Sequence, residues 1–335
     1  MKINKKLILF SLIIGLLIFS PLITAQEIVI EDYEGQKVTI DLPVKKVVCL
    51  SSSANQIIMA LDSFDRVVAW DSNSDEDLFP RPDRDRKVVA RSSHSPQIEA
   101  IAELNPDIVI ADTMLQEDHR KKLESFGISV IVERTSDPDR LFTTIENIAQ
   151  VFEKEKRGKR LISYISGYRQ IIDQRISNID EKDKKKVYWE WRKPFKTGSA
   201  GSTAHSKIVQ NGGLNVAADA KGKYPTVSRE YIWGNDPEII IRQAGRGATE
   251  AEMKELYEEI INRNSLKFTT AVQNNNVHII TWDIFSGLPS IVGDLYFAKW
   301  IHPELFDDIE PSKVYSNLLN EFFGVNDFTH RVYPN

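Results

Sequence analysis

Short apolar runs rich in β-branched residues alternate with segments of helical spacing along most of the chain. From residue 45 onward the runs VVCL, RVVAW, KVVA and DIVIA are separated by polar loops or by stretches such as QIIMALDSF, whose apolar residues share one helical face. Apolar runs of this length are typical of strands buried on both faces of a parallel sheet. The alternation therefore predicts an α/β fold with doubly wound sheets.

The middle of the chain lacks this alternation. Residues 137–180 contain no strand pattern and carry apolar residues at helical spacing, with Gly158 expected to mark a bend or break between two helices. Strand runs resume after Lys186 with VYWEW, EIIIR and VHIITW. A chain of 335 residues also suits two cores rather than one. We expect an N-terminal lobe at 26–138, a helical connector at 139–180 and a C-terminal lobe at 181–335.

Residues 1–25 have the order of a secretory signal. MKINKK is basic, LILFSLIIGLLIF is uncharged, and Ala25 is the best candidate for the last removed residue. Ile23 stands where a small residue is preferred, and the apolar stretch approaches the length that spans a bilayer, so a retained anchor is an alternative. In either case the rest of the chain is predicted to be exported. No Cys follows the apolar run, so no lipid-anchored Cys is expected.

The composition narrows the class of function. The net charge is −5, which does not favour nucleic-acid binding, and the one cysteine, Cys49, lies in an apolar run and is expected to be a core thiol. No two histidines have a spacing typical of metal ligands, so we expect neither a directly bound metal nor a cofactor. The histidines are His94, His119, His205, His278, His302 and His330.

One pattern occurs twice. Glu99 lies seven residues before Pro106, and Glu230 lies seven residues before Pro237; an acidic residue follows each proline, and then an apolar strand run. The separation of 131 residues is too long for a solenoid repeat and indicates two similar lobes. An acidic residue in a first helical turn can simply stabilise the helix dipole. A matched pair in both lobes favours a shared role instead.

The chain resembles the substrate-binding proteins of ABC importers that serve siderophores, haem and cobalamin. The resemblance covers about residues 27–323 and is carried by the order and spacing of IEAIAELNPDIVIA, the long connector, QNGGLNVA, YPTVSREYIWGNDPEIII, AVQNNNVHIIT and AKWIHPELFDDIEP. It implies two αβ lobes joined by a long rigid helix, a ligand cleft between the lobes and a monomer without enzymatic activity. It also implies that Glu99 and Glu230 dock onto arginines of a dimeric ABC permease, which two carboxylates can bind bidentately.

Ligands of doubly wound folds bind beyond the carboxyl ends of the strands, and this rule selects the cleft candidates. Two kinds stand out, although a core or surface position is the simpler explanation for any one of them. Tryptophans offer flat walls for a planar ligand, and arginines favour an anion. The candidates are Ser51, Ser52, Asn55, Trp70, Asn73, Arg91, Thr113, Met114, Trp189, Trp191, Arg192, Ser199, Ser202, Arg242, Arg246, Trp282 and Asp283.

The expected function is capture of a metal chelate (a ferric siderophore, haem or corrinoid) and its delivery to an import permease. Two alternatives keep the fold: an oxyanion-binding protein for molybdate or tungstate, and an anchored sensor or scavenger without transport. An enzyme is the alternative from another class, because GSAGSTAHS places serines near a histidine. That segment is not a GxSxG elbow, and a polar ligand loop or a helix cap explains it better.

Overall fold

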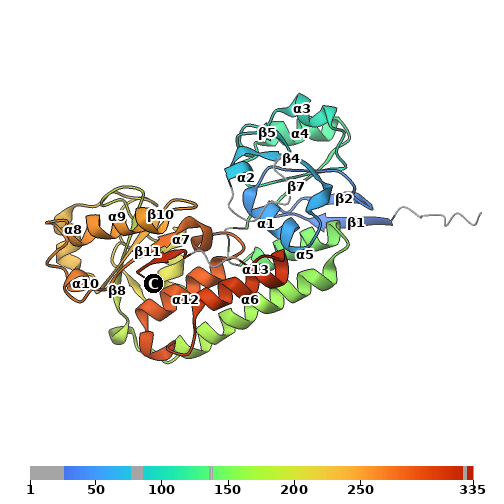
Figure 1. Ribbon diagram of the computed structural model, residues 1–335. Helices are drawn as coiled ribbons and strands as arrows, with labels where there is room; N and C mark the ends of the chain where they lie inside the picture. The colour runs from blue at the N-terminus through green and yellow to red at the C-terminus, as the bar shows by residue number, and fades with distance from the viewer. Residues whose placement is uncertain (1–25, 77–85, 136, 138, 327–329, 335) are drawn as a thin grey trace, which may run out of the picture.

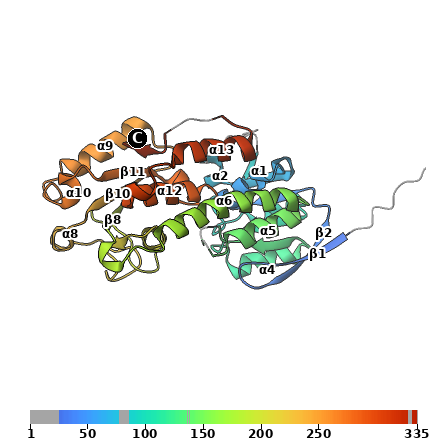
Figure 2. The ribbon, with the colours of Figure 1, turned by 90° about the horizontal axis from the view of Figure 1, so that it is seen from below.

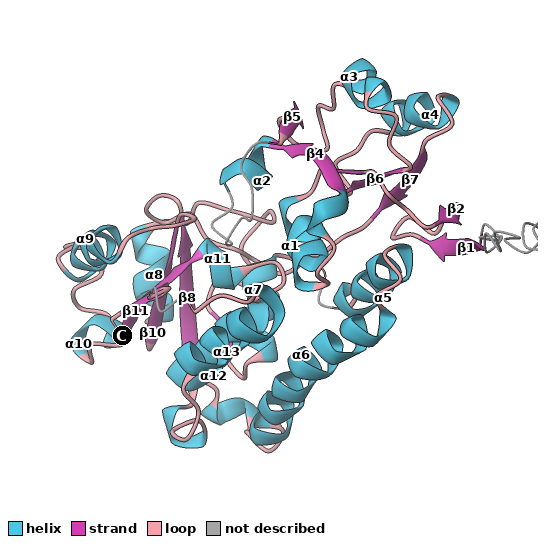
Figure 3. Cartoon of the chain, turned by 45° about the vertical axis from the view of Figure 1, so that its right-hand side comes forward, coloured by secondary structure: helices cyan, strands magenta, loops and turns pink. Residues whose placement is uncertain are grey.

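Two αβ lobes are joined by one long helix in the computed structural model, which describes residues 26–76, 86–135, 137, 139–326 and 330–334 (Figure 1). Each lobe is built on a five-stranded sheet. Parallel strands separated by helices confirm the predicted α/β class. Figure 3 shows helices on both faces of the two sheets.

The N-terminal lobe has the strand order β5-β4-β3-β6-β7, with all neighbours parallel. An antiparallel hairpin of β1 and β2 precedes this sheet. The strands are β1 (Gln26–Glu31), β2 (Lys37–Leu42), β3 (Val47–Cys49), β4 (Val67–Asp71), β5 (Lys87–Ala90), β6 (Ile108–Ala111) and β7 (Ser129–Val132). The helices are α1 (Ser52–Ala60), η1 (Phe64–Arg66), α2 (Ser72–Glu76), α3 (Ile98–Glu103), α4 (Glu117–Ser125) and α5 (Leu141–Val151).

Strand β3 shows why its run is apolar at every position. Val47 and Cys49 pack in the cluster that contains α1 and α5, whereas Val48 and Leu50 pack with α3 and α4 on the opposite face. Successive side chains of a strand point to opposite faces, so both faces of this strand are covered. Burial raises the pKa of the Cys49 thiol, which confirms Cys49 as an inert core residue.

The C-terminal lobe has the strand order β12-β11-β10-β8-β9, and only β12 runs antiparallel to its neighbour. The strands are β8 (Lys186–Trp191), β9 (Leu214–Asn215), β10 (Ile239–Ala244), β11 (Val277–Thr281) and β12 (Val332–Tyr333). The helices are η2 (Glu181–Asp183), α7 (Thr203–Gln210), α8 (Arg229–Asn235), α9 (Glu250–Ile261), α10 (Thr270–Gln273), α11 (Trp282–Phe285), α12 (Ser290–Ile301), η3 (Pro303–Leu305) and α13 (Pro311–Phe323).

The connector is α6 (Glu155–Ile176), but the break before it does not occur at Gly158. Helix α5 ends before Phe152, and Glu153 has a left-handed φ of 58°. Gly158 lies inside α6, where a Cβ would come within 2.7 Å of the Ala149 Cβ. The expectation for Gly158 was therefore wrong: the missing side chain permits close packing of α5 on α6 rather than a bend.

Helix α6 does not link the lobes alone. The Tyr164 hydroxyl donates a hydrogen bond to the Val314 carbonyl of α13 (2.8 Å), and the Arg157 guanidinium donates to the Phe322 carbonyl (2.9 Å). One apolar core continues from α1 and α5 across α6 to α12 and α13. Figure 2 shows α6 running from one lobe to the other. This packing restrains rotation of the lobes about the connector.

Candidate ligand-binding cleft

A cavity of about 1030 Å³ lies between the lobes at the carboxyl ends of β3, β4, β6, β8 and β10. The sequence predicted ligand binding at this edge of the sheets. Ten of the predicted ligand residues line it: Ser51, Ser52, Asn73, Thr113, Met114, Trp191, Arg192, Arg242, Arg246 and Trp282. Residues not chosen from the sequence also line it, namely Ser53, Asp71, Asp112, Arg134, Thr135, Gln243, Ala244, Gly245, Leu256 and Ser286.

The other seven candidates do not line this cavity. Three have clear local roles: Asn55 donates to Ser74 Oγ (2.8 Å), Ser199 donates to the Gly222 carbonyl (2.5 Å) and Asp283 accepts from the Gly247 amide (3.0 Å). Ser202 caps α7 by accepting from the His205 amide (3.1 Å), and it lines a smaller cavity of about 560 Å³ beside α6. The remaining three are Trp70, Arg91 and Trp189.

The tryptophans divide according to their depth in the fold. Trp70 and Trp189 are buried in the main apolar core, so the expectation that they line the cleft was wrong for both. Trp191 and Trp282 are half-buried and line the cavity. Trp189 and Trp191 stack at 6.1 Å between ring centroids, so the buried ring supports the one at the cavity.

Arg242 is the most unusual group in the cavity wall. It lies near the end of β10 and is 3% exposed, and burial lowers its pKa while Glu190 opposes that effect. Glu190 Oε1 is 3.7 Å from its Nη1, beyond a normal hydrogen bond. Its Nε and Nη1 atoms find no hydrogen-bond acceptor among the residues that the structure describes. Buried N–H groups of a guanidinium are costly to leave unpaired.

Glu190 is held by other donors, and its Oε1 remains 3.7 Å from Arg242 Nη1. Glu190 accepts two bonds from Arg263 (2.8 and 3.1 Å), one from the Tyr188 hydroxyl (2.9 Å) and one from the Phe195 amide (2.8 Å). Arg263 also pairs with Glu259 (2.7 Å), so the two arginines and the two glutamates of this cluster balance in charge. Arg192 and Arg246 line the same wall, and Arg134 lines the opposite wall, which belongs to the N-terminal lobe.

The N-terminal wall has a different chemistry. Ser51, Ser52 and Ser53 line it together with two carboxylates, Asp71 and Asp112. Burial raises the pKa of both Asp71 and Asp112. Hydrogen bonds from Ser74 oppose the shift at Asp71, with Ser74 Oγ 2.5 Å from Asp71 Oδ1. The cleft therefore joins a wall of hydroxyls and acids to a wall of arginines and tryptophans.

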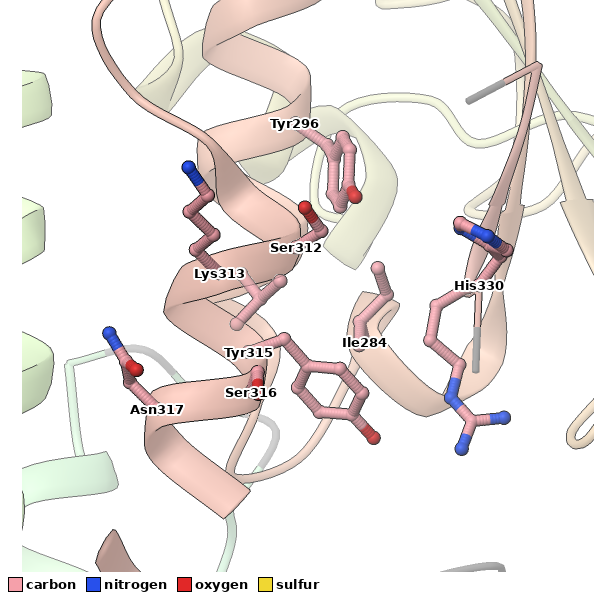
Figure 4. A pocket seen from close by; sticks show the side chains of 10 residues that line it. Ile284, Tyr296, Ser312, Lys313, Tyr315, Ser316, Asn317 and His330 are labelled. Atoms are coloured by element: carbon pink, nitrogen blue, oxygen red, sulfur yellow. The ribbon is translucent and has the colours of Figure 1, made fainter. Parts of the chain in front are cut away.

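A separate cavity of about 460 Å³ lies within the C-terminal lobe, where α11, α12 and α13 face residues 330–331 (Figure 4). Figure 4 shows Tyr296, Tyr315 and His330 around it. All its lining residues belong to one lobe or its closing helices. Closure of the lobes would not enclose a ligand there, so it is not the candidate site.

The two matched glutamates occupy equivalent places in the two lobes. Glu99 lies in the first turn of α3 and Glu230 in the first turn of α8, and both side chains are exposed. Each has a cation of its own chain: Lys122 Nζ is 2.5 Å from Glu99, and Arg229 Nε is 2.6 Å from Glu230. These hydrogen bonds lower the pKa of both carboxyls, so both are ionised at neutral pH.

The rest of the repeated pattern is also structural. Asn105 and Asp236 have left-handed φ angles of 46° and 41° directly before the prolines. The acidic residues after the prolines then bind the start of a neighbouring strand: Asp107 accepts from the Lys46 amide (2.8 Å), and Glu238 accepts from the Lys186 amide (2.9 Å). The repeat thus builds the same helix–turn–strand unit twice.

The fold defines a class of extracytoplasmic solute-binding proteins: two αβ lobes, one long connecting helix and a cavity between the lobes. The chain belongs to the periplasmic binding protein family, whose model matches residues 47–283. Members of this family bind solutes for ABC transporters and are not enzymes. No helix in the described part of the chain is long and apolar enough to cross a membrane. Residues 1–25, with their expected signal or anchor, lie outside that part.

Three comparisons illustrate the range of relatives. The molybdate-binding protein MolA of Haemophilus influenzae is 21% identical over 348 residues, covering 95% of this chain and 96% of MolA. Its molybdate-bound structure has a TM-score of 0.75 at 20% identity, covering 90% of this chain and all of that one. A vitamin B12-binding protein of Vibrio campbellii is 24% identical over 200 residues, 59% of this chain and 70% of the relative.

The third comparison is structural. The TroA-like periplasmic binding protein FepB of Veillonella parvula has a TM-score of 0.79 at 19% identity, covering 91% of this chain and 99% of that one. At these identities the structural likeness shows the fold. The relatives differ in the ligands that their names record, and so they leave the ligand of this chain open.

Proposed function

We propose that this protein captures an anionic metal chelate in the cleft between its lobes and delivers it to an ABC import permease. The observation that carries the proposal is Arg242, a buried guanidinium at the cavity wall whose Nε and Nη1 have no acceptor among the described residues. A carboxylate, catecholate or other oxyanionic group of a ligand in the cavity would pair with this guanidinium. Arg192 and Arg246 would add attraction from the same wall.

The size and apolar parts of the cavity favour a chelate over a simple ion. A volume of about 1030 Å³ is at the upper end of the range for small-molecule sites, about 300–1000 Å³. Trp191 and Trp282 offer ring faces, and Met114 offers a flexible apolar side chain from the opposite lobe. A ferric siderophore or a haem with its carboxylates suits this combination better than a corrinoid without acidic groups.

An oxyanion such as molybdate is the second candidate. The same Arg242 supports it, and MolA, whose name records molybdate, aligns with nearly the whole chain. Molybdate would use the arginines and leave the tryptophan faces uncovered. The two candidates therefore differ in whether Trp191 and Trp282 respond to the ligand.

Delivery would use Glu99 and Glu230. Their equivalent positions, exposure and ionised state suit simultaneous pairing with two arginines of a permease dimer. A sensor or scavenger without transport would have no use for a matched pair at equal places in both lobes. The paired cations Lys122 and Arg229 would have to release or share the carboxylates on docking.

The test is a titration of residues 26–335 with candidate ligands, with tryptophan fluorescence as the readout. The panel contains a ferric tricatecholate, a ferric hydroxamate, haem, cobalamin and molybdate. Saturable quenching by an anionic chelate would support the proposal, because Trp191 and Trp282 line the cavity. Binding of molybdate alone, detected by calorimetry without quenching, would favour the second candidate. Binding of neither kind would contradict both.

A further inference from the structure

Exposed phenylalanine and tryptophan side chains gather at two places on the described surface. Among the described residues, the exposed phenylalanines and tryptophans are Phe126 (53% exposed), Trp233 (47%) and Phe268 (71%). Large aromatic side chains dominate the energetics of protein interfaces. Trp233 lies one helical turn from Glu230 and shares a groove with Phe268, and Phe126 lies one turn from Lys122, which binds Glu99.

In the N-terminal lobe, Lys122 connects the matched glutamate, Glu99, to the exposed ring of Phe126. Its Nζ binds Glu99 Oε1 at 2.5 Å, and Phe126, the C-cap residue directly after α4, follows it by four residues, one helical turn on. Helices α3 and α4 pack against each other. Glu99, Lys122 and Phe126 therefore form one surface, which we name the N-terminal patch.

In the C-terminal lobe, Trp233 follows Glu230 by three residues on α8, so both lie on one face of that helix. The Trp233 indole donates to the Ser265 carbonyl, which fixes the ring. Trp233 and Phe268 together line a groove of about 320 Å³. Glu230, Arg229, Trp233 and Phe268 form the C-terminal patch.

The two patches share a composition although their sequences differ. Each combines an exposed carboxylate, a cation of the same chain that binds it and an exposed aromatic ring. Figure 1 shows α3 and α8 at the outer edges of their lobes, away from α6. The aromatic rings lie outside the ligand cavity, whose wall contains none of them.

We propose that Phe126, Trp233 and Phe268 are permease-docking residues that insert into apolar pockets of the permease beside the arginines that pair with Glu99 and Glu230. This rests on the proposed function, since it assumes that the two carboxylates dock. The partner surface would combine a basic group with an apolar pocket in each subunit, matching the charge and the ring of each patch. Packing of an aromatic ring would give affinity that salt does not screen, whereas the carboxylates would fix orientation.

The first experiment places a photo-crosslinking amino acid at 126, 233 and 268 in the full chain, in cells that contain the transporter. Val88 and Val209, exposed apolar residues outside both patches, are the matched control positions. We expect crosslinks to the membrane subunit of the permease from the three aromatic positions and not from the controls. Crosslinks to a second copy of this chain, or equal crosslinking from the controls, would overturn the proposal.

A fourth crosslinker at Arg229, next to Glu230, separates this proposal from the proposed function. Crosslinking to the permease from 229 but not from 126, 233 or 268 would refute the aromatic contact and leave carboxylate docking intact. No crosslinking to the permease from any position would contradict docking itself.

The affinity for the permease in lipid nanodiscs provides the second readout. We expect Phe126→Ser with Trp233→Ser and Phe268→Ser to weaken binding at least about tenfold, with the loss persisting at high salt. The double variant Glu99→Ala with Glu230→Ala should instead show its largest loss of permease affinity at low salt, where charges are least screened. Because the three rings are exposed, folding should be preserved, and a circular dichroism melt checks this. Unchanged affinity in a folded triple variant would overturn the proposal.

Discussion

The two lobes are alike at the helix–turn–strand unit that the sequence repeats and unlike at their cleft walls. Asn105–Pro106–Asp107 and Asp236–Pro237–Glu238 build the same turn, with Glu99 and Glu230 in equivalent places. At the cleft, one wall carries serines and acids, whereas the other carries Arg192, Arg242 and two tryptophans. Surfaces that would meet a symmetric transporter are repeated, and surfaces that would meet an asymmetric ligand are not. The repeat therefore indicates a partner, and the difference indicates a ligand.

The largest expected effect concerns the repeated feature. Glu99→Ala with Glu230→Ala should abolish ligand uptake in proteoliposomes, because both arginine contacts are lost, while ligand affinity stays within about twofold. Each single variant should impair uptake to a similar degree, since the two positions are equivalent. Glu103→Ala with Glu255→Ala, two exposed carboxylates on α3 and α9, is the control. Loss of ligand binding would mean that the glutamates belong to the cleft.

The next effect concerns the wall that is not repeated. Trp191→Ala with Trp282→Ala should weaken binding of an aromatic chelate roughly tenfold, because two ring faces are lost from the cavity. Molybdate affinity should not change. Calorimetry on both ligands measures this, with the exposed Trp233→Ala as the matched control. Equal losses for both ligands would indicate that the tryptophans only support the wall.

The smallest effect concerns the acidic wall. Burial raises the pKa of Asp71 above its ordinary 3.8. Below pH 3.8 such an acid is protonated in both the folded and the unfolded state and does not change the free energy of unfolding. As pH rises through the folded-state pKa, the unfolded state is the one that ionises more easily, so the folded protein loses stability. Asp71→Asn should therefore gain stability relative to the parent between pH 3.5 and pH 7. Urea unfolding at both pH values tests this, and a relative loss at pH 7 would contradict it.

The sequence predicted the lobes and the repeated helix–turn–strand unit better than it predicted the cleft. Strand runs and their polar exits are local patterns, and VVC, IVIA, VYWEW and III all lie in strands. The Glu–Pro repeat was visible because it recurs. The position of the break before α6 was missed because Gly158 was expected to mark it, whereas Gly158 permits close contact with Ala149.

The cleft was only partly predictable because the sequence does not show how far along a strand the core ends and the cavity begins. Trp189 and Trp191 lie on the same face of β8, and the two-residue step to the carboxyl end decides that one is core and the other lines the cavity. Arg134 was missed although it follows the strand run SVIVE and obeys the same rule as the other loops. Pairing of Glu190 by Arg263, which frees Arg242, joins residues 73 positions apart and has no local signature.

The most direct test of the account is the affinity of Arg242→Gln for the anionic ligand that binds the parent protein. Calorimetry should show at least a tenfold loss, since a charge-assisted hydrogen bond contributes about 1.5–3 kcal/mol. Arg91→Gln, an exposed arginine outside the cavity wall, should bind as the parent does. The fold should persist, because Arg263 still binds Glu190. Unchanged affinity in Arg242→Gln, or a parent protein that binds only an uncharged ligand, would contradict the central claim.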